Sequence, residues 1–194
     1  MMNIDDIKNM LKNMLSPKRF AHSIHVMEAA RMLAEKYGED PEKAELAGLI
    51  HDCAKDLDKS TTFTLCQKYD IMIDDIMQKQ PEILHGKVGA FLARDLFGVE
   101  CPRVLDAVAD HTMGRENMDK LSSIIFIADY IEAGRQYEGV DEIRKAAESS
   151  LEEAIVAGVD NTITHVLKKG GLLHPQTIQT RNWAIGQLKD KTGK

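Results

Sequence analysis

One short stretch decides how the whole chain is interpreted. It reads Ala47-Gly48-Leu49-Ile50-His51-Asp52-Cys53-Ala54-Lys55. An apolar helix is expected from Ala44 to Ile50, and it leads directly into a His-Asp doublet with Cys and Ala behind it, which predicts a mostly buried setting. A buried carboxylate is costly unless it is paired or bound to a cation. The stretch therefore predicts a helical core that carries a charged site, with a metal ion as the first candidate for its partner.

Helical periodicity extends from this stretch towards both ends of the chain. Proline at the first helical position and glycine just beyond the last one mark several boundaries. We find no run of alternating residues bounded by turns, so no sheet is expected, and residues 70–84 are less regular. The expected helices cover residues 4–15, 17–37, 41–51, 60–69, 85–97, 102–111, 119–132, 141–157, 161–169 and 175–189.

The length of 194 residues fits one domain, so we expect a single all-α domain over residues 1–194. Its core should span about residues 15–135, and a C-terminal helical extension should span about residues 140–190. The weakest candidate boundary lies near Gly134 to Val140, where the chain becomes more charged.

Composition excludes several classes of partner. A formal net charge of -6 lacks the positive footprint that DNA or RNA binding requires, so no nucleic-acid partner is expected. A small phosphorylated ligand stays compatible, because a metal cluster can supply local positive charge.

The sequence shows neither the pattern of a signal peptide nor that of a membrane-spanning helix. The N-terminus has no basic segment followed by an apolar one, and the run Ile124 to Ala128 is far too short to span a bilayer, so no membrane partner is expected. The three cysteines show no CxxC spacing, which favours reduced thiols and a cytoplasmic protein.

A second acidic residue, like Asp52, lies in a segment that we expect to be buried. Asp129 lies in an apolar run that we expect to be almost wholly buried, Ile124-Ile125-Phe126-Ile127-Ala128-Asp129-Tyr130-Ile131. A lone acid there would strongly destabilise the fold, so Asp129 is an independent pointer to a cation. His22, His85 and His111 offer imidazoles on other helices. Imidazole and carboxylate together suit iron, manganese or zinc, and no thiolate is needed.

The ordered set of these residues resembles the HD-domain superfamily of metal-dependent phosphohydrolases. Two extra histidines between the doublet and the last Asp are typical of its dinuclear branch, and several segments more specifically resemble the YqeK family. It covers roughly residues 15–185. The segments that carry it are Arg19-Phe20-Ala21-His22-Ser23, Ala47 to Lys55, Leu84-His85-Gly86, His111-Thr112-Met113-Gly114, Ile127-Ala128-Asp129-Tyr130-Ile131-Glu132, His174-Pro175 and Thr180-Arg181-Asn182.

This resemblance implies an HD-domain helical bundle and the symmetrical hydrolysis of diadenosine tetraphosphate to two ADP by a metal-activated water. It also implies two divalent or trivalent transition-metal ions, with iron as the expected native metal and manganese, zinc, cobalt or nickel as alternatives. Carried onto this chain, the first ion is held by His22, His51, Asp52 and Asp129. The second is held by His85 and His111, and Asp52 bridges the two.

Several residues are expected to contact the substrate. Lys55 is four residues after His51, so a helix that continues through Lys55 would place its ammonium on the metal face, where it could act with Asp52 in catalysis. The alternative is a solvent-exposed lysine at a helix C-terminus. The further substrate candidates, each with a surface or turn role as its alternative, are Arg19, Thr112, Gly114 and Arg135.

Other polar residues receive other roles. His25 should lie beside the site or at the surface, His165 should be structural, and His174 should cap the last helix. Ser60 is expected to cap the helix that follows it. Met113 stands where the family pattern has a small polar residue, which puts any substrate contact from that position in doubt.

The sequence leaves three readings of function open. The first is the dinucleoside-tetraphosphate hydrolase. The second keeps the metal site but acts on a nucleoside mono- or triphosphate or a cyclic dinucleotide, because one fold serves several reactions. The third is a non-catalytic helical module that senses a nucleotide. An apolar face on the helix expected at 141–157 is compatible with a homodimer.

Overall fold

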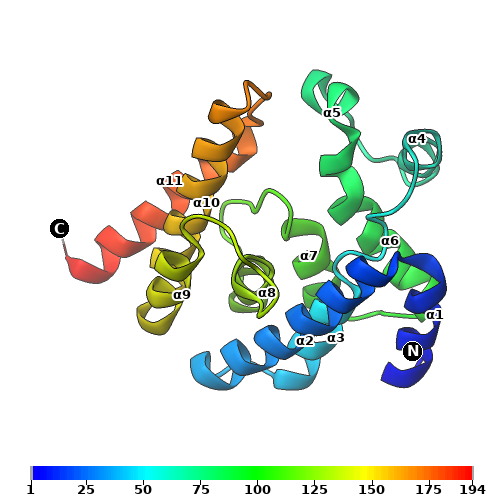
Figure 1. Ribbon diagram of the computed structural model, residues 1–194, viewed down its shortest axis with the longest axis horizontal. Helices are drawn as coiled ribbons and strands as arrows, with labels where there is room; N and C mark the ends of the chain where they lie inside the picture. Colours follow the sequence, from blue (N-terminus) through cyan, green and yellow to red (C-terminus); the bar gives the residue numbers. More distant parts are fainter. Residues whose placement is uncertain (1, 194) are drawn as a thin grey trace.

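A computed structural model describes residues 2–193 of the chain, and this part is all-α, as expected (Figure 1). It contains no strand, and none of its helices is long and apolar enough to cross a membrane. The helices are α1 (Ile4–Met14), α2 (Pro17–Tyr37), α3 (Pro41–Ile50), α4 (Lys59–Lys68), α5 (Asp75–Lys79), the 3-10 helix η1 (Pro81–Leu84), α6 (His85–Phe97), α7 (Pro102–Asp110), α8 (Lys120–Ile131), α9 (Val140–Ser149), α10 (Leu151–Lys168) and α11 (Pro175–Thr192).

Helix α8 is the central element of the bundle. Its apolar run from Ile124 to Ala128 is fully buried, and α8 packs against α2, α7 and α10. Figure 1 shows α8 nearly end-on in the middle of the molecule, with α2 and α3 on one side and α9 to α11 on another. The C-terminal end of α8 therefore lies where helices from both halves of the chain meet.

Two glycines let pairs of helices approach closely enough to bring histidines together. A Cβ on Gly48 of α3 would lie 3.0 Å from the Met27 Cα of α2. A Cβ on Gly86 of α6 would lie 2.9 Å from the carbonyl oxygen of Ala109, which is in α7. It would also lie 2.7 Å from the Oγ1 of Thr112, which follows α7. Any larger residue at either position would push its helix away from its neighbour.

The C-terminal part differs from the expected helices at 141–157 and 161–169. The break lies at Ser150, whose hydroxyl accepts hydrogen bonds from the Glu152 and Glu153 amides and so caps a new helix. That helix, α10, then continues unbroken through Gly158, because the Tyr130 ring packs where a side chain on Gly158 would stand. The two predicted helices were therefore divided at the wrong residue.

The cap of α4 also differs from the sequence expectation. Asp58, not Ser60, caps α4, because the Asp58 carboxylate accepts a hydrogen bond from the Thr61 amide. The apolar residues of the segment 141–157 are in part covered by the chain's own helices: Ile143, Ala147 and Ile155 are buried, whereas Ala146 and Val156 are only partly buried. A homodimer through this segment stays a prediction.

Candidate metal centre

Three buried histidines are each oriented by their own backbone. The Nδ1 atoms of His51, His85 and His111 lie 2.7, 2.5 and 2.7 Å from the carbonyl oxygens three residues earlier, which belong to Gly48, Glu82 and Val108. A carbonyl can only accept, so each Nδ1 carries the proton and donates it. The lone pair of each imidazole is therefore on Nε2, the atom that faces the centre of the bundle.

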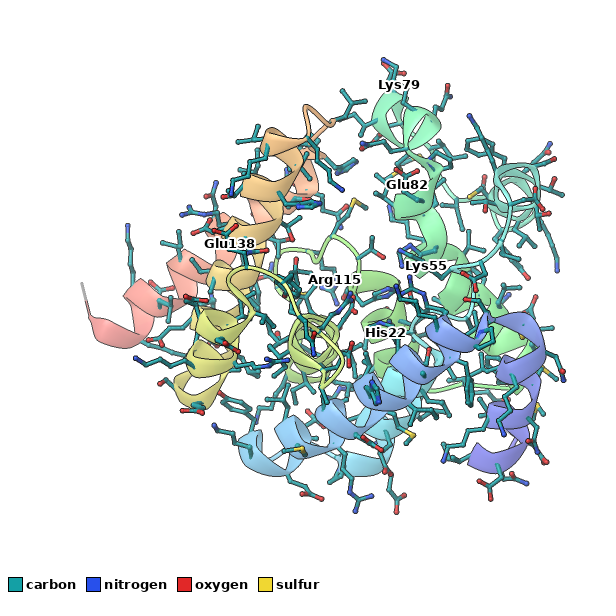
Figure 2. The ribbon with its side chains drawn as sticks, viewed as in Figure 1. His22, Lys55, Lys79, Glu82, Arg115 and Glu138 are labelled. Atoms are coloured by element: carbon teal, nitrogen blue, oxygen red, sulfur yellow. The ribbon has the colours of Figure 1, made fainter. Side chains whose placement is uncertain are left out.

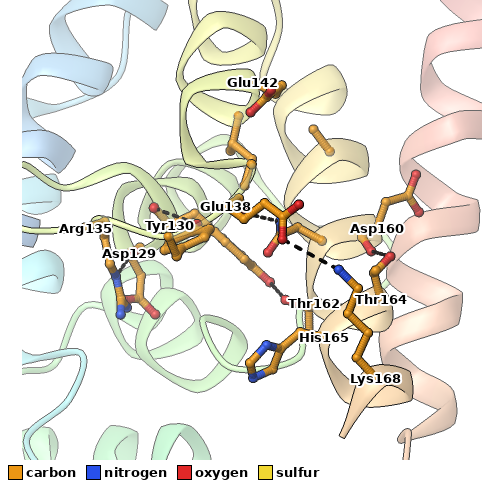
Figure 3. Close-up of a pocket in the computed structure, with 15 residues that line it drawn as sticks. Asp129, Tyr130, Arg135, Glu138, Glu142, Asp160, Thr162, Thr164, His165 and Lys168 are labelled. Carbon is orange, nitrogen blue, oxygen red and sulfur yellow. Dashed lines mark hydrogen bonds and ion pairs between the residues drawn. The ribbon is translucent and has the colours of Figure 1, made fainter.

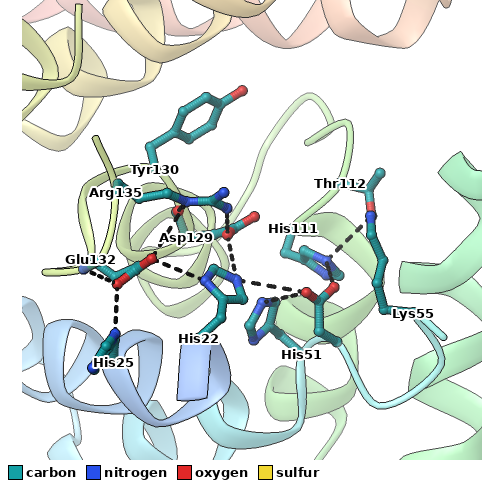
Figure 4. A network of polar contacts seen from close by, with 12 residues as sticks. His22, His25, His51, Lys55, His111, Thr112, Asp129, Tyr130, Glu132 and Arg135 are labelled. Carbon is teal, nitrogen blue, oxygen red and sulfur yellow. Dashed lines mark hydrogen bonds and ion pairs between the residues drawn. The ribbon is translucent and has the colours of Figure 1, made fainter. Parts of the chain in front are cut away.

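The fourth histidine, His22 of α2, is oriented by a distant residue. Its Nδ1 lies 3.1 Å from the Glu132 Oε1, where α8 ends. Glu132 is only 4% exposed and also contacts the His25 Nδ1 at 3.1 Å and the Gly134 amide at 2.5 Å (Figure 4). A carboxylate on the far nitrogen fixes the tautomer of an imidazole and leaves its Nε2 free to bind a metal.

Asp52 lies between two groups of these side chains. Its Oδ2 is 3.4 Å from the His51 Nε2 and 3.6 Å from the His22 Nε2. Its Oδ1 is 3.0 Å from the His85 Nε2 and 3.4 Å from the His111 Nε2. One carboxylate thus offers one oxygen to each group.

Asp129 completes the first group. Its Oδ1 lies 3.0 Å from the His22 Nε2. The set His22, His51 and Asp129 offers three ligand atoms within 4.8 Å of one another, and so does the set His51, Asp52 and His111.

The donor set fits metal ions. The Nε2 atoms of His22 and His51 are buried and have no hydrogen-bond partner among the described residues. The Nε2 atoms of His85 and His111 lie 2.9 Å apart, and both are lone-pair atoms because both Nδ1 protons point at carbonyls. Buried lone pairs directed at one another are costly without a cation between them. Neutral imidazoles with carboxylates suit transition metals.

The electrostatics of the centre keep its acids charged. Burial by itself raises the pKa of Asp52, but positive charge at His51 and hydrogen bonding from His111 lower that pKa well below its usual range, so positive charge at this position keeps the carboxylate ionised. The pKa of Asp129 is likewise lowered, against the effect of burial, by His22, His51 and Arg135. Burial lowers the pKa of His85 to about 4, so this imidazole is neutral at pH 7, as a ligand must be.

Lys55 reaches the centre by a different route from the one expected. Helix α3 ends at Ile50, and the residues that follow form turns, so the helix does not continue through Lys55. These turns still place the Lys55 Nζ 3.4 Å from both ring nitrogens of His85. Burial lowers the pKa of the Lys55 ammonium. Figure 4 shows Lys55 beside His111 and Thr112, across the histidines from His22, and Figure 2 shows where Lys55 and His22 lie in the whole molecule.

Two arginines contact the acids of the centre. The Arg19 Nη1 donates to the Asp52 Oδ2 at 2.7 Å. The Arg135 guanidinium donates to the Asp129 carboxylate and, through Nε, to the Asp129 carbonyl at 2.8 Å. Asp129 is less buried than its apolar run predicts, since its side chain is 22% exposed where α8 ends. The charged groups therefore form one connected network.

Thr112 and Gly114 follow His111 but lie in different surroundings. The Thr112 hydroxyl lies 3.3 Å from the His85 Nε2, so it borders the centre. Gly114 has a positive φ of 65°, and a Cβ there would clash with the Thr180 side chain of α11. Packing against Thr180 therefore explains the need for glycine at position 114 without any contact to a substrate. Thr180 also donates to the Met113 carbonyl at 2.8 Å.

The remaining histidines lie outside the centre. His25 reaches it only through Glu132. His174 caps α11, as expected, and its Nε2 lies 2.7 Å from Asp74. His165 lies on an exposed part of α10. Glu132 is the residue that sequence reasoning missed, although its position three residues after Asp129 at the end of a buried run was a signal for a role in the same site.

Comparison with known proteins assigns this arrangement to a class. The HD domain model matches residues 19–134, which include the four histidines and both acids of the centre. The chain therefore belongs to the HD domain family.

Full-length relatives define the branch of that family. The chain is 42% identical to the symmetrical bis(5'-nucleosyl)-tetraphosphatase of Halalkalibacterium halodurans, over 97% of this chain and 100% of that one. It is 37% identical to the protein of the same name from Bacillus subtilis, over 95% and 98% of the two chains. The chain is thus a member of the symmetrical bis(5'-nucleosyl)-tetraphosphatase family, and the resemblance found in the sequence motifs is confirmed.

A solved structure agrees with this fold. An HD superfamily hydrolase involved in NAD metabolism from Clostridium acetobutylicum matches with a TM-score of 0.93 and 45% identity, over 96% of this chain and 99% of that chain. The likeness extends beyond the HD region into α9 to α11, because nearly the whole of both chains is aligned.

Proposed function

We propose that this chain hydrolyses diadenosine tetraphosphate symmetrically to two ADP, with the help of two bound transition-metal ions. The observation that carries the proposal is Asp52, which offers one oxygen to His22 and His51 and the other to His85 and His111. The full-length relatives bear the name of this activity. A sensing module without catalysis would not need six preorganised ligands, one of them a bridging carboxylate.

We propose that the ligands divide between two metal positions. His22, His51, Asp52 and Asp129 would hold one ion, and His85 and His111 would hold the other with Asp52 between them. When bound, such ions lower the pKa of water and neutralise charge on the phosphoryl group. Iron is our proposed native metal, with manganese, zinc, cobalt or nickel as alternatives that the same donors accept.

Protein cations beside the centre are suited to bind the phosphate chain. The Lys55 ammonium lies over the His85 ring and would neutralise charge on the departing ADP. Arg19 holds the Asp52 carboxylate in its orientation and keeps part of its guanidinium exposed for a phosphate oxygen. Arg135 does the same for Asp129. Thr112 is the uncharged candidate at the same edge.

The cellular setting follows from the chemistry of the chain. The three cysteines Cys53, Cys66 and Cys101 are free, which suits a reducing compartment, and we propose the cytoplasm. Burial raises the pKa of Cys53 to about 12, and its thiol donates to the Gly89 carbonyl at 3.5 Å, so we propose no ligand role for it.

The experiment that tests the function is product analysis. Metal-loaded protein is incubated with diadenosine tetraphosphate, and the products are separated by chromatography. ADP as the single product supports symmetrical cleavage. ATP with AMP would contradict it, and turnover of a nucleoside triphosphate or cyclic dinucleotide alone would favour another HD-type phosphohydrolase. Protein stripped of metal under the same conditions should give no product.

A further inference from the structure

We infer that a cavity of about 860 Å³ beside the metal centre binds a nucleoside, namely the adenosine end of one half of the substrate (Figure 3). This inference rests on the proposed function, because it gives a place to the part of the substrate that the metal ligands do not contact. The cavity lies between the end of α8, the segment that follows it, and helices α9 and α10.

The cavity begins at the metal centre itself. Asp129 and Arg135 belong to the charged network described above, and both also line the cavity. From there the lining continues to Thr164 and His165 on α10. Its volume is in the range of about 300–1,000 Å³ that is typical of small-molecule sites. A phosphate chain held at the metals would therefore lead one nucleoside into this space.

The charges of the lining disfavour phosphate there. Arg135, the phosphate candidate named above, stands at the end of the cavity that meets the metal centre. Beyond it the lining has one lysine, and the Lys168 Nζ is already paired with Glu138 at 3.6 Å. The carboxylates of the lining outnumber these cations, because Asp129, Glu138, Glu142 and Asp160 all line the cavity, and of these Asp160 is paired with Arg181 of α11. Carboxylates repel phosphate but accept hydrogen bonds from ribose hydroxyls and from the amino group of adenine.

The phosphate chain has a separate place. Lys55 and Arg19 lie against His85 and Asp52, with no part in the cavity lining. Figure 4 shows Lys55 on the far side of the histidines from Arg135 and Tyr130. The anionic and the uncharged parts of one nucleotide would therefore bind on opposite sides of Asp52.

Two tyrosines give the cavity an aromatic wall. The hydroxyl of Tyr130 lies 2.7 Å from the Thr162 hydroxyl, and the hydroxyl of Tyr137 donates to the Tyr130 carbonyl at 2.9 Å. These bonds fix both rings, and the Tyr130 ring also packs on Gly158. Both residues line the cavity, where fixed aromatic surface favours the stacking of a base.

The inference is tested by filling the cavity from an exposed position. Thr164 is exposed on α10 and lines the cavity, so Thr164→Trp obstructs it without disturbing the core. Leu167→Trp is the matched control, because Leu167 lies on the same helix, is 65% exposed and is not part of the lining. His165→Trp obstructs the cavity from the next position and serves if Thr164→Trp fails to fold, which thermal unfolding would show.

The measurement is calorimetric binding of ADP and of inorganic pyrophosphate to the metal-loaded protein. We expect wild type to bind ADP about tenfold more tightly than pyrophosphate. Thr164→Trp should bind ADP about tenfold more weakly than wild type does, and its affinity for pyrophosphate should not change. Leu167→Trp should match wild type. Unchanged ADP affinity in Thr164→Trp and His165→Trp, or equal affinity of wild type for both ligands, would overturn the inference.

Binding and cleavage measured on the same proteins distinguish a failure of this inference from a failure of the proposed function. If wild type converts diadenosine tetraphosphate to ADP but the obstructed variants bind ADP normally, the function stands and the nucleoside site is wrong. If wild type binds ADP through this cavity but does not cleave diadenosine tetraphosphate, the site stands and the proposed function is wrong.

Discussion

The histidines of the centre are held in two different ways. His51, His85 and His111 each donate from Nδ1 to a carbonyl three residues earlier, so one turn of backbone orients each ring. His22 donates instead to Glu132, which is 110 residues away in the sequence. Three ligands are therefore prepared by local structure, whereas the fourth is correctly oriented only when α2 and the end of α8 have packed together.

This difference has a consequence for metal binding. The locally oriented rings keep their Nε2 atoms directed at the centre as long as their own helices are formed. The position that includes His22 depends in addition on tertiary packing. Disturbing Glu132 should therefore weaken one position, whereas disturbing Asp52 should weaken both.

The largest effect is expected from Asp52→Asn. The amide keeps the size of the side chain but removes the charge that both ligand groups share, and only one oxygen remains to bridge them. We expect kcat for diadenosine tetraphosphate to fall by about 10³-fold or more. Both ions should be lost on dialysis, as measured by metal analysis. Loss of a single ion would contradict the bridging position of Asp52.

A smaller and one-sided effect is expected from Glu132→Ala. Without this carboxylate the His22 ring loses the partner that fixes its tautomer, and second-sphere changes of this kind cost about 10–100-fold in metal affinity. Metal titration should show one weakened position and one unchanged position. Glu132→Gln, which keeps an oxygen acceptor, should recover part of the loss.

His25→Ala is the matched control for Glu132, because it removes the other imidazole that contacts this carboxylate and leaves the His22 contact in place. It should bind both ions normally. Equal weakening of both positions in Glu132→Ala would show that Glu132 acts on the fold as a whole.

Gly86→Ala tests the packing that brings His85 to His111. The added methyl would lie 2.7 Å from the Thr112 Oγ1 and 2.9 Å from the Ala109 carbonyl, so α6 must move away from α7. We expect a destabilisation of about 1–3 kcal/mol in chemical denaturation, together with weaker binding of the second ion. Gly186→Ala on α11 meets nothing within 4 Å and should be neutral or slightly stabilising. Equal stability of the two variants would contradict the close approach.

The smallest effect is expected far from the centre, at Ser150→Ala. Its hydroxyl caps α10, and losing such a cap costs about 1 kcal/mol, a shift of about 2–4 °C in Tm for a chain of this size. Because Ser150 touches no ligand, kcat should not change. Ser60→Ala should leave Tm unchanged, since Asp58 caps α4. A drop in Tm as large as that of Ser150→Ala would show that Ser60 caps α4, as the sequence suggested.

The sequence predicts most of this fold because its helix boundaries depend on local signals. Proline at Pro17, Pro41, Pro102 and Pro175 marks four helix starts correctly. The break at Ser150 and the continuity through Gly158 escaped prediction, because the Tyr130 ring that packs on Gly158 comes from another helix. Propensity at one position does not report such a contact.

The site shows the same division. The buried acids Asp52 and Asp129 predicted a cation, and the resemblance to the HD-domain superfamily supplied the full ligand set with its histidines. The structure brings these side chains together. Glu132 was missed because its role appears only through its contact with His22 on another helix. Lys55 was predicted to reach the site because the helix would continue through it. The structure contradicts that reason, since Lys55 lies in the turns after α3 and still contacts His85.

The arrangement of two ions across Asp52 is tested most directly by anomalous diffraction from crystals of anaerobically metal-loaded protein. We predict two anomalous peaks on opposite sides of the Asp52 carboxylate, one beside His22, His51 and Asp129 and the other beside His85 and His111. A single peak bound by all four histidines, with Asp52 on one side of it, would contradict the dinuclear centre.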